Sequence, residues 1–127
     1  MSHPSAQIPY LLIFRSPDAG PTRPEGELPE NFAVWMAWID GLKAKGLSLG
    51  GHPLEDEGRV LRPRDQPATD GPFAEGKEVV GGTLIILAPN LDEACEIGRG
   101  CPGLNSDISV EVRRLMTVPE RFARTLC

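Results

Sequence analysis

The sequence predicts an α+β fold in which two helices cover one face of a mainly antiparallel sheet. Three observations support this. A chain of 127 residues is long enough for one domain only, apolar stretches of strand and helix period alternate along it, and glycine and proline mark their ends. Fourteen glycines and thirteen prolines exceed average usage. Because 40% of the residues are hydrophobic and 24% are charged, we interpret this excess as turn chemistry in a compact fold.

The first strand and the first helix are separated by a long proline-rich segment. Residues 8–15 (IPYLLIFR) are rich in β-favouring residues and predict a strand. Four prolines follow within thirteen residues and exclude a helix interior, so we expect a loop over residues 16–28. Large apolar residues then recur at three- and four-residue steps and predict a helix over residues 30–45, which Gly46 is suited to end.

Three strands are predicted in the middle of the chain. Residues 47–54 form the second strand, in which Gly50 and Gly51 mark a bulge or bend. Residues 59–62 form a short edge strand, and residues 65–73 (DQPATDGPF) are expected to be a loop because of their turn residues. Residues 79–87 (VVGGTLIIL) form the strongest strand, and their continuous apolar end is typical of a central position.

The last third of the chain predicts a second helix and a final strand. Asn90 is a suitable N-cap for a helix over residues 91–99, with acidic residues in its first turn. Residues 108–115 alternate in polarity, which predicts a strand with one apolar face and one wet face, the wet face carrying Ser109, Glu111 and Arg113. From Pro119 onward we expect a tail with a turn of helix around residues 121–123.

The predicted order is therefore β-α-β-β-β-α-β, with two βαβ-like halves around a hairpin. Right-handed crossovers place both helices on the same face of the sheet, which is a ferredoxin-like architecture. We predict one domain over residues 1–127, with a core of about 8–118 and a tail of 119–127. The strand around residues 83–87 is apolar on both faces, so we expect the uncovered face to be buried against a second copy, in a homodimer.

Composition and charge exclude several classes of partner. The net charge is −5 and there is no basic block, which argues against nucleic-acid binding. The longest apolar run, residues 84–88, is far below the roughly 20 residues that a membrane helix needs, and residues 1–4 do not resemble a signal peptide. Three cysteines without a CxxC motif indicate a reducing compartment and inert thiols, so we expect a cytoplasmic protein. No ligand-spaced cluster points to a metal or another cofactor.

Two residues are candidates for proton chemistry. Asp70, held by the Gly71-Pro72 sequence, is either a general base or the centre of an Asx-type turn. His52 follows two glycines at a strand bend and is either an acid–base group or a solvent-facing histidine. The two would form an acid–base pair if the hairpin folds back toward the loop that holds Asp70. The sequence does not show that they meet.

Further residues near Asp70 are candidate ligand contacts. Lys77 either orients a polar or anionic ligand or belongs to a solvated charge pair, while Phe73 would supply an apolar wall and Gly71 would line the site. Gly81 and Gly82 form no phosphate-binding motif. They are expected to allow a bulge or the close approach of a dimer partner.

Several stretches resemble the DGPF proteins of the YCII-related family. The most specific is residues 69–82 (TDGPFAEGKEVVGG), supported by residues 49–51 (LGG), 91–94 (LDEA) and 109–113 (SVEVR). The resemblance implies a dimeric α/β-barrel form of the ferredoxin-like fold. In some relatives it implies a histidine–aspartate pair in the cavity between the two sheets. Related sequences are also associated with extracytoplasmic-function sigma factors.

The chain departs from the usual family pattern at three places. Gly76 replaces a common threonine, Thr83-Leu84 replaces an aromatic pair, and no histidine of the first strand or loop matches that of the dyad-bearing relatives. Such a dyad is therefore not inherited by position. We predict a small-molecule-binding cytoplasmic homodimer in which Asp70 and His52 handle protons. The alternative is a non-enzymatic interaction module associated with transcription, and the sequence leaves open whether the protein is an enzyme.

Overall fold

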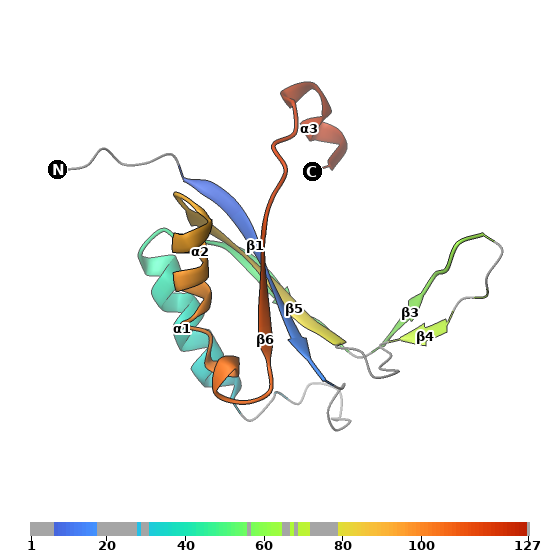
Figure 1. Cartoon of the computed structure of the whole chain (residues 1–127), viewed down its shortest axis with the longest axis horizontal. Helices are drawn as coiled ribbons and strands as arrows, with labels where there is room; N and C mark the ends of the chain where they lie inside the picture. The colour runs from blue at the N-terminus through green and yellow to red at the C-terminus, as the bar shows by residue number, and fades with distance from the viewer. Residues whose placement is uncertain are drawn as a thin grey trace.

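The computed structural model describes residues 7–17, 28, 31–55, 57–64, 67, 69–71 and 79–126, with residues 69–71 described by their backbone. Four antiparallel strands form the main sheet: β1 (Ile8–Ser16), β2 (Ser48–Pro53), β5 (Val79–Ala88) and β6 (Ser109–Arg114). Their spatial order is β2-β5-β1-β6. The helices α1 (Phe32–Ala44) and α2 (Leu91–Gly98) both lie on one side of this sheet (Figure 1). The predicted ferredoxin-like α+β fold is confirmed.

The core lies between the sheet and the helices. In β1, every second side chain is buried under the helices: Tyr10, Leu12 and Phe14. In β5, Leu84, Ile86 and Ala88 are buried in the same layer. The period of two along each strand thus sends alternate side chains into this core, as the sequence predicts.

Trp35 and Trp38 of α1 close one end of the core around Phe14. Their ring centroids lie 4.9 and 6.1 Å from that of Phe14, in edge-to-face geometry. This geometry is favourable for aromatic rings because it brings a positive ring edge to a negative ring face. Both tryptophans pack against the buried cluster, so the apolar face of α1 belongs to the core.

The ends of the two helices follow their sequence signals closely. The amide nitrogen of Glu93 donates a hydrogen bond of 2.9 Å to Oδ1 of Asn90, so the predicted N-cap of α2 is confirmed. Helix α1 begins at Phe32 and ends at Ala44, inside the predicted limits of 30–45; residues 29 and 30 lie outside the described residues. A short 3-10 helix, η1 (Pro102–Asn105), follows α2 and leads into β6.

A separate hairpin corrects two predictions. Strand β3 (Gly58–Val60) pairs with β4 (Thr69–Gly71) in a two-stranded sheet of its own, so β3 is not the edge of the main sheet. Figure 1 shows this hairpin standing apart from the four-stranded sheet. The prediction of a loop over residues 65–73 is wrong for residues 69–71. Its Asp-Gly sequence is a turn signal, but here these residues pair through their backbone with β3, the preceding strand.

Register shifts beside glycines adapt β5 to its two neighbours, β2 and β1. The register of β2 shifts between Ser48 and Gly50, where Gly50 has a φ of 108° that favours glycine. A second shift opposite the Phe14–Arg15 step of β1 leaves Gly81 as the extra residue of β5. A Cβ atom on Gly82 would lie 3.0 Å from the carbonyl oxygen of His52. The predicted bulges are confirmed, and Gly82 admits β2 of the same chain.

The C-terminal segment ends in a helix, α3 (Glu120–Leu126), that is longer than the predicted turn. None of its residues is buried, and Figure 1 shows it beyond the end of β6 and away from the sheet. In the part of the chain that the structure describes, no helix has the length and apolar character needed to cross a membrane.

Candidate functional site

The candidate site is the sheet face opposite the helices, which we call the open face. Alternate residues of the strands project to it, because their neighbours are buried on the helix side. None of the described helices covers this face (Figure 1). It is formed by Pro9, Leu11, Ile13 and Arg15 of β1, His52 of β2, Thr83, Ile85 and Leu87 of β5, and Glu111 and Arg113 of β6. The centre of the face is therefore mainly apolar, while β6 brings charges to one side.

Strand register arranges these residues in rows across the sheet. Ile13 is paired with Thr83 of β5 on one side and with Glu111 of β6 on the other, and His52 of β2 is paired with Thr83. Residues directly opposite one another on antiparallel strands share a face. His52 and Glu111 therefore stand at the two ends of one row. With strands about 4.8 Å apart, three strand spacings separate their backbones by roughly 14 Å.

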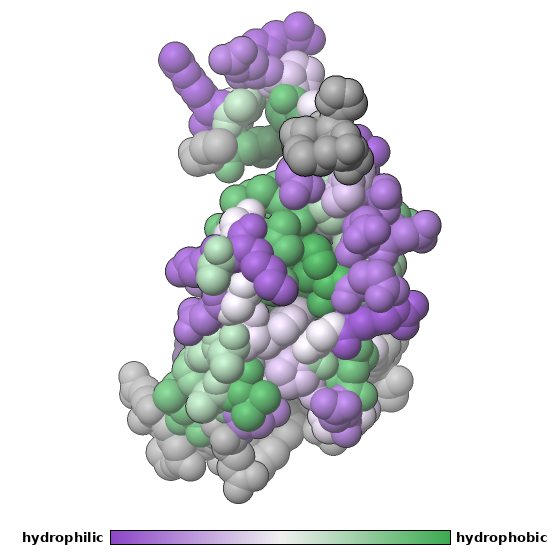
Figure 2. Space-filling model, turned by 90° about the vertical axis from the view of Figure 1, so that its left-hand side faces the viewer, coloured by the Kyte–Doolittle hydropathy of each residue, from purple (hydrophilic) through white to green (hydrophobic). Residues whose placement is uncertain are grey.

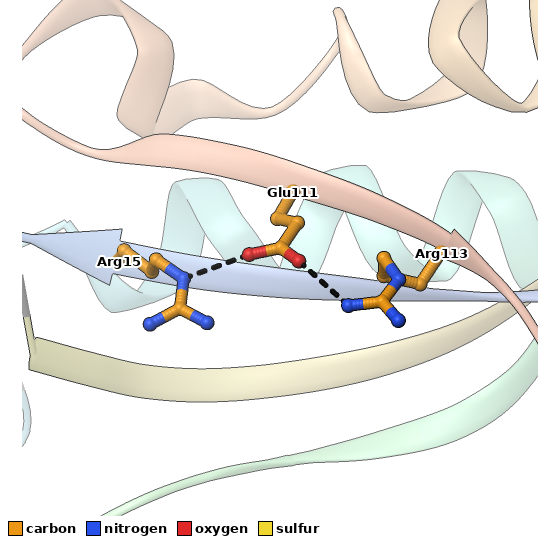
Figure 3. A network of polar contacts seen from close by, with 3 residues as sticks. All are labelled: Arg15, Glu111 and Arg113. Atoms are coloured by element: carbon orange, nitrogen blue, oxygen red, sulfur yellow. Dashed lines mark hydrogen bonds and ion pairs between the residues drawn. The ribbon is translucent and has the colours of Figure 1, made fainter.

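A three-residue ion-pair network occupies the β1–β6 side of the open face (Figure 3). Nε of Arg15 donates to Oε1 of Glu111 at 3.0 Å, and Nη1 of Arg113 donates to Oε2 of Glu111 at 3.1 Å. The side chains of Arg15 and Glu111 are 30% and 36% exposed, and that of Arg113 is 68% exposed. Hydrogen bonds from Arg113 and Arg15 lower the pKa of Glu111, so the carboxylate is ionised at neutral pH.

Sequence reasoning did not single out this network as a site. Glu111 and Arg113 were predicted to lie on the wet face of their strand, and Arg15 simply ended the first strand. Arg15 and Glu111 are 96 residues apart in the chain, so no local spacing signals their contact. One indication was present in the sequence. The ferredoxin-like order makes β1 and β6 neighbours, so the polar face of β6 is expected to lie beside an apolar face of β1.

The predicted proton-handling residues lie on different elements. His52 is exposed on β2, at the edge of the main sheet, whereas Asp70 is in β4 of the separate hairpin, where it is the pairing partner of Arg59. The structure describes Asp70 and Gly71 by their backbone only, and Phe73 and Lys77 lie outside the described residues. The pairing of His52 with Asp70, and the ligand contacts of the other three, therefore stay predictions.

Two open grooves lie away from the central rows of the open face. One, of about 440 Å³, runs between α1 and α2 and is lined in part by Trp38, Leu42 and Ile97, with Glu93 and Glu96 on its rim. Figure 2 views the molecule from the helix side and shows hydrophobic surface flanked by hydrophilic surface. The other, of about 420 Å³, lies where β1 begins and α2 starts. His52 lines neither groove.

The two described cysteines are shielded from solvent to different degrees. Cys101 is 1% exposed, and burial raises the pKa of its thiol, which disfavours the nucleophilic thiolate. Cys95 is partly buried. Among residues 7–17, 31–55, 79–126 and the short described segments between them, no three metal-ligating side chains are grouped.

Taken together, the strand order, the two helices on one face and the apolar open face with its charged side define a ferredoxin-like α+β domain. A family model for the YCII-related domain matches residues 23–118. The chain belongs to the YCII-related family, as the resemblance over residues 69–82 predicts. No curated protein is similar enough to this chain to count as a match.

Proposed function

We propose that two copies of this chain associate through their open faces and enclose a cavity that binds a small organic molecule. The observation that carries the proposal is the cluster of apolar side chains at the centre of that face. Leu11, Ile13, Ile85 and Leu87 stand on the two central strands and are only partly buried in the single chain. Covering them with a second sheet removes apolar surface from water, which is the main favourable term in association.

The same packing would give the cavity its polar groups. Each copy contributes His52 from one edge of the sheet and the network of Arg15, Glu111 and Arg113 from the other side. A covered, largely apolar cavity with a few polar groups is the usual form of a small-molecule site. In this proposal the protein works in the cytoplasm. Its acid–base chemistry depends on His52 with Asp70, while Lys77 orients the ligand, Phe73 forms an apolar wall and Gly71 lines the site.

The oligomeric state tests the first half of the proposal. Light scattering at micromolar concentration should give twice the mass of one chain, which is 13.8 kDa. Ile85→Glu places a charge at the centre of the open face and should give a monomer. Val34→Glu is the matched control, because Val34 is 57% exposed on α1, on the other side of the sheet. A monomeric wild type, or a variant Ile85→Glu that remains dimeric, would overturn the packing.

A thermal-shift screen against pools of metabolites tests the second half. A ligand that binds the native state raises the unfolding temperature, by mass action. The shift should occur with wild type and Val34→Glu and disappear with Ile85→Glu. For pools that stabilise the protein, His52→Asn and Asp70→Asn then separate binding from proton chemistry: both variants should still bind and lose turnover. Pools that stabilise Ile85→Glu as strongly as wild type would place the ligand site elsewhere.

A second function, a non-enzymatic interaction module, is favoured by α3. This helix has no buried residue, and it exposes Phe122 by 51% and Leu126 by 71%. Exposed aromatic and aliphatic residues on one short helix are suited to a groove on a protein partner. Removal of residues 119–127 should abolish partner capture if this function is correct and leave the ligand-induced thermal shift unchanged if the small-molecule function is correct.

A further inference from the structure

We propose that the ligand of the open face is a small carboxylate with an apolar body, held at its charged end by Arg15 and Arg113. This inference rests on the proposed function, since it assigns a chemical class to the ligand of the same cavity. Its starting point is the charge of the network. Two guanidinium groups share one carboxylate, Glu111, so the three side chains carry a net charge of +1.

Among the residues that the structure describes, the network uses only a few of the hydrogen-bond donors of Arg15 and Arg113. A guanidinium has five N–H donors, and Glu111 accepts from one nitrogen of Arg15 and one nitrogen of Arg113. Figure 3 shows that the terminal nitrogens of Arg15 and the second terminal nitrogen of Arg113 point away from Glu111, toward β5. Both groups therefore present donors to the middle of the open face, where an anion can accept from both.

Glu111 also holds the two arginines in place before a ligand arrives. A free arginine loses rotamer freedom when it binds, and a partner that already restrains it reduces that cost. Elsewhere in the described structure, Arg99 and Glu96 form a one-to-one pair on α2 with side chains 71% and 68% exposed. That pair has no excess charge and its side chains are exposed at the end of α2, which makes it a matched control for a purely structural ion pair.

The neighbouring residues select the rest of the ligand. Leu11 is the pairing partner of Arg113, and Ile13 is the pairing partner of Glu111, so apolar side chains begin immediately beside the charges. Ile85, opposite Leu11 on β5, continues the apolar surface toward the centre of the face. A ligand with its carboxylate on the arginines would lay an aliphatic or aromatic body over these residues.

The net charge of the network favours a monoanion over a dianion. Burying an unbalanced charge in a covered cavity is costly because the cavity has a lower effective dielectric constant than water. A carboxylate neutralises the +1 charge of the network, whereas a phosphate monoester carries about −1.5 to −2 at neutral pH and leaves an excess of negative charge. The site is therefore expected to prefer carboxylates.

The test compares benzoate with its uncharged analogue benzamide, and with phenyl phosphate, by titration calorimetry and by amide chemical shifts of the intact protein. Benzoate, titrated into the millimolar range, should shift amides of β1, β5 and β6 and bind at least about tenfold more tightly than benzamide, since hydrogen bonds between charged groups are the strong ones. Phenyl phosphate should bind more weakly than benzoate. Equal binding of benzoate and benzamide, or no binding of benzoate to the dimer, would overturn the inference.

Variants assign the binding to the network. Arg113 is exposed enough for Arg113→Gln to keep the fold, and this variant should weaken the binding of benzoate by roughly 10- to 100-fold. Arg113→Lys should weaken it by less, because lysine keeps the charge but lacks the planar guanidinium group. Arg99→Gln should change nothing. Glu111→Gln raises the charge of the network to +2 and should reverse the preference between benzoate and phenyl phosphate. A loss with Arg99→Gln as large as with Arg113→Gln, or an unchanged preference in Glu111→Gln, would contradict the charge argument.

The failure of this inference differs from the failure of the proposed function. If light scattering gives a monomer, the enclosed cavity does not exist and both are wrong. If the protein is a dimer that neutral molecules stabilise while benzoate does not bind, only the carboxylate assignment is wrong.

Discussion

Gly51 is expected to be the most sensitive glycine of the main sheet. It lies in β2, next to His52, where the bulge at Gly50 brings the backbones of β2 and β5 together. A Cβ atom added at Gly51 would lie 2.2 Å from the carbonyl oxygen of Thr83 and 2.7 Å from Cα of Leu84. Real Cβ atoms essentially never approach other atoms within 3.0 Å. Gly51→Ala therefore requires the two strands to separate locally by at least 0.8 Å, the difference between 3.0 and 2.2 Å.

The cost follows from the nature of the contact. The atoms that Gly51→Ala would meet are backbone atoms of the central strand, which cannot rotate away as a side chain can. Overpacking of this kind costs about 1–3 kcal/mol, and here the shift also strains the hydrogen bonds between β2 and β5. For a domain of this size the unfolding temperature should fall by about 4–10 °C.

Gly41→Ala is the matched control. Gly41 lies in α1, has no atom within 4 Å of the position its Cβ would take, and is exposed. Alanine in a helix interior is favoured over glycine by about 0.5–1 kcal/mol, so Gly41→Ala should stabilise the protein. The same substitution should thus have opposite signs at the two positions.

Urea unfolding followed by circular dichroism measures both variants against wild type, with the midpoint compared at unchanged slope. Amide spectra should show that Gly51→Ala moves the resonances of His52 and Thr83. The reasoning is refuted if the stability of Gly51→Ala is within about 0.5 kcal/mol of wild type, the range of ordinary surface substitutions. A destabilised Gly41→Ala would equally show that the local geometry is not as described.

Three further predictions concern a helix cap, an ion pair and a thiol. Asn90→Ala removes the acceptor for the Glu93 amide and should lower the free energy of unfolding by about 0.5–2 kcal/mol, measured by urea unfolding. Amide hydrogen exchange at the start of α2 should also become faster. An unchanged exchange rate would argue against the cap. Arg113 and Arg15 lower the pKa of Glu111 in the folded state. The stability that these ion pairs contribute is therefore complete above the unfolded-state pKa of about 4.3, and it is lost as the pH falls through the folded-state pKa. Glu111→Gln should flatten the curve of stability against pH below about pH 4.3 and leave its shape above that pH unchanged. Burial raises the pKa of the Cys101 thiol, so iodoacetamide should label Cys95 before Cys101 in the native protein. Equal labelling rates for the two cysteines in the absence of urea would contradict the burial of Cys101.

Most of the fold could be predicted because its signals are local. The alternation of Tyr10, Leu12 and Phe14, the helical spacing in α1 and the Asn90 cap each depend on neighbouring residues, and the structure keeps all of them. The spatial order of the four strands follows from element order and from the handedness of the crossovers. The one strand that was missed, β4, carries turn residues and pairs with β3 only through its backbone register.

The candidate site could be predicted only in part. A histidine after two glycines is visible in the sequence, and the structure places His52 on the open face through its pairing with Thr83. The network of Arg15, Glu111 and Arg113 could not be predicted, because it depends on the register of β1 against β6, which the order of the strands alone does not set. Whether His52 meets Asp70 depends on the orientation of a hairpin that the sequence does not specify.

The sequence by itself therefore determined the strands of the main sheet, the helices α1 and α2, the Asn90 cap, the bulges and the apolar character of the strands, because each of these is set by residues close together in the chain. The tertiary structure decided which face of the sheet stays open and which charges gather on it. It did so because strand register, which pairs residues as far apart in the chain as Leu11 and Arg113, determines the neighbours of every side chain on that face.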